Sequence, residues 1–188
     1  QKRKFRFCGR EYKQYDDFSI KVTCKDNTEK ILPINFSREG RVLESPASAT
    51  EIAQMRSVIG SLAWIARQVR PRLSYRCSKL QSVVNAAQMK HLEVCNKILQ
   101  EAISTSDEGL FFEAGAFNFN EAIMVTITDA SWAGEKLVID NKTFPRRSQY
   151  GRFNCLGHPD LWDGMQASVH IISWKSGLIR KQCRSTFR

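Results

Sequence analysis

The stretch Ile123-Met-Val-Thr-Ile-Thr-Asp-Ala-Ser-Trp132 combines apolar and β-branched residues with an acid near its end. Such a compact run predicts a β-strand. Period-two alternation places Ile123, Val125, Ile127 and Asp129 on one side of that strand. Burying a lone carboxylate is costly, so Asp129 must be hydrated, paired or bound to a metal ion. Spacing alone leaves two readings open: a solvated acid at a strand end, which is the commoner case, or a ligand for Mg²⁺.

Further strands are expected on the C-terminal side of this run. Gln149–Leu156 and His170–Trp174 have strand character, and a turn is predicted after the second at Ser176-Gly177. Another short run begins near Cys183, and the turn-rich segment His158–Gly164 forms a loop. The region from residue 123 to the end is therefore predicted to be rich in strands.

Before this region, residues 48–105 are predicted to be helical. Ser48-Ala-Thr-Glu51 is a capping box, which satisfies free backbone donors at a helix start. Pro71 ends the first helix and suits the first turn of the next. In the first helix, apolar residues recur at spacings of three and four: Ile52, Met55, Ile59, Leu62, Ala66 and Val69. The next two helices have apolar faces of their own: Leu73, Cys77, Leu80, Val84 and Ala87, then Leu92, Cys95, Leu99 and Ala102.

The N-terminal part is predicted to hold two or three short strands, because apolar residues alternate loosely over residues 1–37. Within it, Tyr15-Asp-Asp-Phe18 is interpreted as a hairpin turn. Residues 37–47 carry Ser, Gly and Pro and indicate a linker. Residues 106–122 contain Gly, Asn and several acids, and we interpret them as a connection between two domains.

The overall composition is that of a globular protein with a strong basic excess. Of 188 residues, 42% are hydrophobic and 26% are charged, and 29 Lys and Arg against 19 Asp and Glu give a formal charge of +10. This excess favours a nucleic-acid partner, because phosphate contacts dominate nucleic-acid affinity. The alternative is a solvated basic surface. No run of about 18 apolar residues occurs, so no membrane contact is expected.

The six cysteines form no C-x-x-C pair, and the histidines complete no zinc pattern. We interpret the cysteines as reduced, mostly buried thiols. That interpretation predicts an intracellular protein, cytoplasmic or nuclear.

Charge is unevenly distributed within the helical region. From Ile52 to Leu92 there is no Asp or Glu, whereas seven basic residues are present. Arg72, Arg76 and Lys79 fall on one face of the second helix. Because ordinary solvated helices mix charges of both signs, an adjacent phosphate backbone is the favoured explanation.

Six segments resemble, in order, the Pol polyprotein of copia-type LTR retrotransposons. Phe7–Glu11 is similar to F-L-G-x-E, and Arg56–Ala66 followed by Arg70-Pro71 is similar to R-x-x-I-G-S-L-x-Y-L-A…R-P. The other four segments are His91 with Lys97–Leu99 (H…K-x-I-L), Asp129–Gly134 (D-A-D-W-A-G), Arg146–Gly157 (R-R-S-x-x-G…L-G) and Ile172–Ser176 (I-S-W-x-S).

The resemblance implies an α+β chain: a small strand hairpin, a three-helix, thumb-like bundle, and a partial ribonuclease H-like mixed sheet. Residues 1–47 would be the end of the reverse transcriptase palm with a linker, and 48–105 the thumb. After the connection at 106–122, residues 123–188 would be the N-terminal part of ribonuclease H. The parent protein would be an RNA-directed DNA polymerase and an endonuclease that hydrolyses RNA in RNA–DNA hybrids.

The resemblance also implies site residues. Asp129 matches the first catalytic, metal-binding carboxylate of a site for two Mg²⁺ ions. The second carboxylate is expected about two residues beyond Arg188, because Arg184-Ser-Thr186 is similar to the opening of S-S-T-x-A-E. This chain alone is therefore expected to be inactive, and a non-catalytic nucleic-acid-binding remnant is the alternative function.

The expected partners are an RNA–DNA hybrid or a primer–template duplex, together with the rest of the Pol polyprotein. The residues predicted to contact nucleic acid are Arg56, Arg67, Arg72, Arg76, Lys79, Arg146, Arg147 and Lys175. For the last three of these, a solvated basic loop is the competing interpretation.

Overall fold

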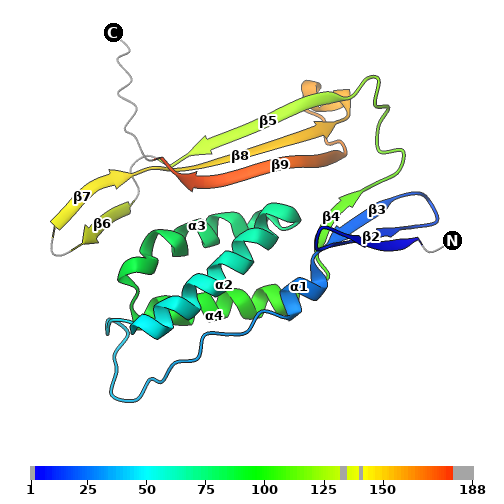
Figure 1. Ribbon diagram of the computed structural model, residues 1–188. Coiled ribbons are helices and arrows are strands. Elements are labelled where there is room, and N and C mark those ends of the chain that lie inside the picture. The colour runs from blue at the N-terminus through cyan, green and yellow to red at the C-terminus, as the bar shows by residue number, and fades with distance from the viewer. Residues whose placement is uncertain (1–2, 132–134, 140–141, 180–188) are drawn as a thin grey trace, which may run out of the picture.

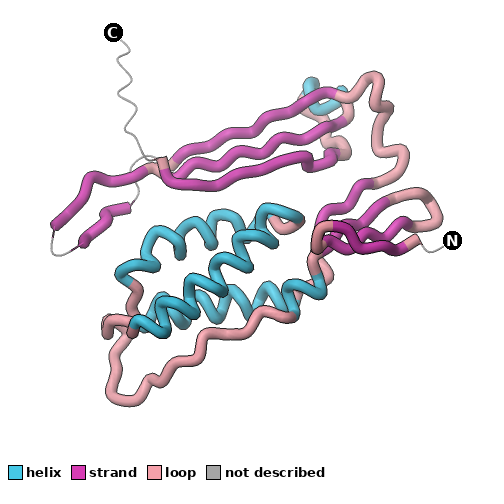
Figure 2. Tube along the Cα trace, in the orientation of Figure 1, coloured by secondary structure: helices cyan, strands magenta, loops and turns pink. Residues whose placement is uncertain are grey.

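The computed structural model describes residues 3–131, 135–139 and 142–179. Within them the chain is a mixed α+β protein with four α-helices and two main antiparallel sheets (Figures 1 and 2). The sheet of β5, β8 and β9 lies over the helices, and the sheet of β1 to β4 lies beside one end of them (Figure 1). The α+β prediction is confirmed.

The first sheet has the strand order β1-β2-β3-β4. Its strands are β1 (Lys4–Phe7), β2 (Arg10–Gln14), β3 (Ile20–Thr23) and β4 (Gly109–Phe112). The two-residue turn Cys8-Gly9 joins β1 to β2, with positive φ at both residues, as a tight hairpin turn requires. The predicted N-terminal strands are thus confirmed.

Tyr15-Asp-Asp-Phe18 forms the predicted turn between β2 and β3. The Phe18 N–H donates to the Tyr15 carbonyl, and the Asp17 carboxylate accepts from both the N–H and the hydroxyl of Ser19. Strand β4 was not predicted, since it comes from the segment interpreted as a connection. A short helix, α1 (Lys25–Glu29), was not predicted either.

The predicted helices form as α2 (Ala49–Gln68), α3 (Ser74–Val83) and α4 (Met89–Ser104). Short 3₁₀ turns, η1 (Pro71–Leu73) and η2 (Val84–Ala86), flank α3. The capping box is confirmed, because Glu51 N–H donates to the Ser48 hydroxyl and Ser48 N–H donates to the Glu51 carboxylate. The predicted apolar faces of all three helices contribute buried residues to one core.

The second sheet has the order β5-β8-β9 and is antiparallel throughout. Its strands are β5 (Ile123–Ala130), β8 (Gln149–Gly157) and β9 (Val169–Leu178). Between β8 and β9 lies the 3₁₀ turn η3 (Pro159–Asp163). One face of this sheet lies over α3, and α4 lies on the side of the helical region that is away from the sheet (Figure 1).

The structure differs from the sequence prediction at two points in this region. The turn predicted at Ser176-Gly177 is wrong, because β9 runs on to Leu178. Strands β6 (Glu135–Ile139) and β7 (Lys142–Arg147) pair with each other and were not predicted. The run predicted near Cys183 lies outside the described residues.

Five cysteines lie in the described part of the chain, and all are free thiols. Four are buried, as predicted, while Cys8 is exposed. Burial raises the pKa of the Cys24 and Cys95 thiols to about 12, so neither forms a thiolate near neutral pH. None of the helices in the described ranges has both the length and the apolar character that a membrane span needs.

Candidate nucleic-acid interface

Asp129 lies near the end of β5, at an edge of the second sheet. In register it faces Gly151 of β8, which in turn faces Ser176 of β9. The Asp129 residue is exposed, and its side chain has no hydrogen bond or ion pair within the described residues. The neighbouring Ile127 is 60% exposed, so this half of β5 extends beyond the cover of the helices.

The described residues around Asp129 do not assemble a site for two metal ions. Within the described ranges, no group of three His, Cys, Asp or Glu residues is placed to hold a metal. Asp160, a later acid, lies 3.2 Å from the ring of His158 in the loop after β8. The described donor set therefore does not fit a two-Mg²⁺ centre, which needs several carboxylates. We derive no chemical step through a metal.

Two polar contacts fix the sheet against the helices. The indole Nε1 of Trp174 donates to the backbone carbonyl of Ala66, at 2.7 Å. The Gln149 amide lies 3.2 Å from the Ser78 hydroxyl on α3 and 2.7 Å from the Ser176 hydroxyl on β9. Since alternate strand residues share a face, the face that holds Trp174 and Ser176 is the one turned toward the helices.

Two hollows near this junction have one lining residue in common, Lys175. The first, of about 450 Å³, lies between α2, α3 and β9 and is bordered by Arg67 and Ser78. The second, of about 420 Å³, lies on the second sheet and is bordered by Asp129 and Arg152. Lys175 borders both, because β9 is an edge strand of the sheet.

We use the name cationic track for the three exposed cations that border these hollows, Arg67 on α2 and Lys175 and Arg152 on the second sheet. Because Trp174 and Ser176 face the helices, Lys175 and Arg152 lie on the opposite face of the sheet from them. Arg152 and Lys175 are direct partners in the register of β8 and β9. Like charges directly opposite each other destabilise a sheet. No carboxylate within the described ranges forms an ion pair with any of the three.

An aromatic ring lies beside the track. The Lys175 ammonium is 6.0 Å from the centroid of the Tyr150 ring, within reach of a cation–π contact. The Tyr150 ring lies against Gly177 on β9, where an added Cβ would be 3.1 Å from the ring. Gly177 thus leaves room for the ring beside the cations.

Other predicted cations are placed differently. Arg56 is exposed and donates to the side-chain oxygen of Asn85, at 2.9 Å. Arg72 and Arg76 both pair with Glu101 of α4, at 3.2 and 2.5 Å. Their helix face is acid-free in sequence, but in the fold an acid from another helix neutralises part of it.

The remaining predicted cations add less to the site. Lys79 is exposed on α3. Arg146 and Arg147 belong to β7, but their side chains lie outside the described part of the structure. Arg152 was not predicted from the sequence. It is recognised only from the structure, where it is the register partner of Lys175.

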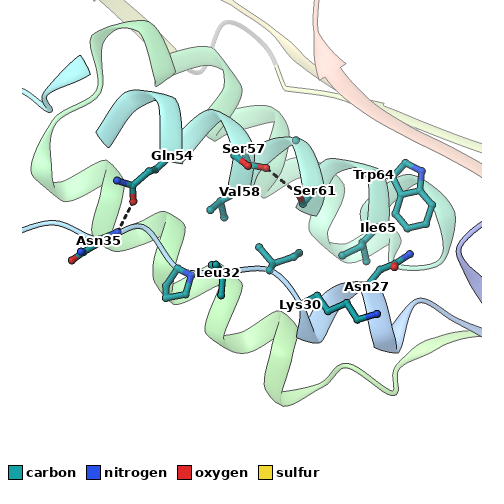
Figure 3. Close-up of a pocket in the computed structure, with 13 residues that line it drawn as sticks. Asn27, Lys30, Leu32, Asn35, Gln54, Ser57, Val58, Ser61, Trp64 and Ile65 are labelled. Atoms are coloured by element: carbon teal, nitrogen blue, oxygen red, sulfur yellow. Dashed lines mark hydrogen bonds between the residues drawn. The ribbon is translucent and has the colours of Figure 1, made fainter. Parts of the chain in front are cut away.

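A larger hollow of about 930 Å³ lies between α2 and the segment 30–35 (Figure 3). Its polar groups are partly used within the protein. The Gln54 side-chain oxygen accepts from the Asn35 N–H at 2.7 Å, and the Ser61 hydroxyl donates to the Ser57 carbonyl at 3.1 Å. Lys30 is the one cation among its described lining residues. The hollow therefore has a weaker claim to an anionic ligand than the track.

No protein-family model, curated protein or solved structure matches this chain.

Proposed function

We propose that this chain binds the phosphate backbone of an RNA–DNA hybrid or primer–template duplex, as part of a copia-type retrotransposon Pol polyprotein. The observation that carries the proposal is the cationic track of Arg67, Lys175 and Arg152. These exposed cations border two hollows that have Lys175 in common, and none of them has an ion pair with a carboxylate within the described residues.

A phosphate backbone accounts for the track physically. Placing Arg152 directly opposite Lys175 costs energy in the free protein, and the attraction of a bound anion to both cations would outweigh their repulsion. Phosphates spaced along a strand suit cations spaced along a surface, and their counterions are released on binding. The net charge of +10 also favours association with a polyanion.

The contact between Trp174 and Ala66 supports the link to the Pol polyprotein. It joins two of the segments that carry the resemblance, Ile172–Ser176 and Arg56–Ala66, across 108 residues of sequence. In this proposal residues 48–105 act as the thumb-like bundle. Residues 123–188 begin the ribonuclease H-like sheet. Among the described strands β5 is an edge strand of this sheet, so its outer backbone groups are available to pair with a further strand.

The proposal assigns Asp129 as one catalytic carboxylate of the parent protein, which would carry out RNA-directed DNA synthesis and Mg²⁺-dependent hydrolysis of RNA. A second candidate function is that of a non-catalytic nucleic-acid-binding remnant. The isolation of Asp129 from other acids within the described residues favours the second for this chain by itself.

Binding to a fluorescently labelled RNA–DNA hybrid across a salt series tests the proposal. Lys175→Gln and Arg152→Gln should each weaken binding and reduce the slope of log K against log salt by about 1. Arg38→Gln is the matched control, because Arg38 pairs with Glu93 of α4, away from the second sheet. An unchanged slope in both track variants, or an equal loss in the control, contradicts the proposal.

A cleavage assay separates the two candidate functions. The chain alone, with Mg²⁺, should leave the RNA strand of the hybrid intact, since one carboxylate cannot hold two metal ions. Cleavage that disappears in Asp129→Asn would show instead that the chain is itself a nuclease.

A further inference from the structure

A third hollow, of about 440 Å³, lies where the first sheet, the end of α2 and β9 meet. It is separate from the hollow that contains Asp129. Two arginines border it, Arg10 of β2 and Arg67 of α2, together with the Gln68 side chain. No Asp or Glu is among its described lining residues. Its ionic character is therefore wholly positive.

The fold holds Arg10 at this hollow by a ring contact. Arg10 and Tyr12 alternate onto one face of β2, and the Arg10 guanidinium carbon lies 5.6 Å from the centroid of the Tyr12 ring. The Arg10 Nε is buried and has no hydrogen-bond partner within the described residues. A buried donor without an acceptor is costly, so such a group requires an explanation.

Arg67 reaches the hollow from the last turn of α2. It is exposed and has no ion pair within the described ranges. Two guanidinium groups that face one hollow repel each other weakly. An oxyanion bound to both would form charge-assisted hydrogen bonds, of the forked kind that arginine makes with phosphate.

Apart from Ser173, the rest of the wall is apolar and aromatic. Val22, Leu110 and Phe112 come from the first sheet, and Ile171 and Trp174 come from β9. A mostly apolar hollow of this size with a few polar groups is typical of small-ligand sites. Aromatic rings also offer surfaces on which a nucleobase can stack.

We propose that this hollow binds a nucleoside monophosphate unit, with its phosphate on Arg10 and Arg67 and its base against the apolar wall. The unit can come from a free nucleotide or from the 5′ end of a nucleic-acid strand. The inference goes beyond backbone binding by the cationic track, because it depends on Arg10 and on a base-sized apolar wall.

Calorimetric titration with adenosine 5′-monophosphate tests the site, with adenosine and inorganic phosphate as partial ligands. The full chain should bind the nucleotide at least tenfold more tightly than either part alone. Arg10→Gln and Arg67→Gln should each weaken nucleotide binding about tenfold or more. Arg38→Gln should leave it unchanged, and Arg10→Lys should restore it only in part, since lysine lacks the guanidinium fork.

The Lys175→Gln variant separates this site from the track, because it should weaken hybrid binding and leave nucleotide binding unchanged. Titration with 5′-phosphorylated and unphosphorylated oligonucleotides identifies the source of the nucleotide. If the protein prefers the phosphorylated strand and Arg10→Gln abolishes that preference, the natural ligand is the 5′ end of a strand. If both strands bind equally while the nucleotide still binds, the natural ligand is a free nucleotide.

Three results would overturn the proposal. The first is the absence of nucleotide binding by the wild-type chain. The second is inorganic phosphate binding as tightly as the nucleotide, which would indicate a simple anion site. The third is unchanged affinity in Arg67→Gln, a variant of an exposed residue that should fold normally.

Discussion

The indole Nε1 of Trp174 donates to the backbone carbonyl of Ala66, 2.7 Å away. Ala66 lies in the last turn of α2, where carbonyl groups lose their helical partners. The Arg70 N–H, which would bond to Ala66 in a continued helix, bonds instead to the Ile65 carbonyl. A side chain from β9 thus provides the hydrogen-bond donor for a free carbonyl group at the end of α2.

Trp174→Phe should lower the free energy of unfolding by about 1–3 kcal/mol, because it leaves the Ala66 carbonyl without its partner while retaining an aromatic ring. Urea unfolding followed by circular dichroism measures the change. Trp162→Phe is the matched control, since Trp162 is 83% exposed. Equal stability of the two variants would show that the hydrogen bond contributes nothing.

The acid at the start of α2 should make stability depend on pH. Arg41 donates to both carboxylate oxygens of Glu51, at 2.6 and 3.0 Å, and this interaction lowers the pKa of Glu51 to about 2. Because the folded-state pKa lies below the ordinary value, the contribution is complete above about pH 4.5 and is lost as the pH falls through 2.

Glu51→Gln should therefore lower Tm by a few degrees at neutral pH, and its difference from wild type should close as the pH falls toward 2. Thermal melts over a pH series measure this. Glu44→Gln, at an exposed position in the preceding linker, should have the same Tm as the wild type at every pH. A Glu51→Gln deficit that persists unchanged at pH 2 would contradict the linkage.

Two neighbouring arginines should differ sharply in their effect on stability. The Arg70 side chain is 1% exposed and donates to the Ala102 carbonyl at 2.8 Å and to the Thr105 hydroxyl at 2.5 Å. Burial lowers its pKa, and the nearby Glu108 carboxylate opposes that shift. Arg72 is 48% exposed and takes part only in surface contacts.

Arg70→Ala should cost about 2–4 kcal/mol, because it removes charged donors from buried acceptors at the end of α4. Arg72→Ala should cost less than about 1 kcal/mol, as is usual for exposed ion pairs. Denaturant midpoints of the two variants provide the comparison. Equal losses would mean that burial does not distinguish the two side chains.

The sequence predicted the helices well because their signals are local. The spacing of Met55, Ile59 and Leu62 defines a face within one helix, and the capping box spans only four residues. Strand β4 was missed for the opposite reason. Phe112 of β4 pairs with Ile20 of β3, about ninety residues earlier in the chain. A strand of four residues has no local sequence pattern that would identify so distant a partner.

The site was predictable only in part, for the same physical reason. The alternation around Asp129 placed it on a strand, but only the tertiary fold brings Lys175, Arg152 and Arg67 together. The segment from Ile52 to Leu92 contains no acid, so its sequence gave no indication that Glu101 of another helix pairs with its arginines. Periodicity identifies faces within an element, whereas charge balance depends on which faces meet.

The pairing of Arg72 and Arg76 with Glu101 leads to a direct test of their predicted role in nucleic-acid binding. The Arg76 contact lowers the pKa of Glu101, so this acid stays ionised at neutral pH and holds both arginines. Glu101→Gln should free Arg76 and leave Arg72 with its ion pair to Glu108, 3.3 Å away. Affinity for an RNA–DNA hybrid should therefore rise severalfold at low salt, and the salt dependence should steepen. Glu121→Gln, at an exposed position, removes the same charge without freeing an arginine and should have a much smaller effect. If the two variants bind the hybrid equally well, Arg72 and Arg76 have a structural role only. The contact with the phosphate backbone is then made by the cationic track.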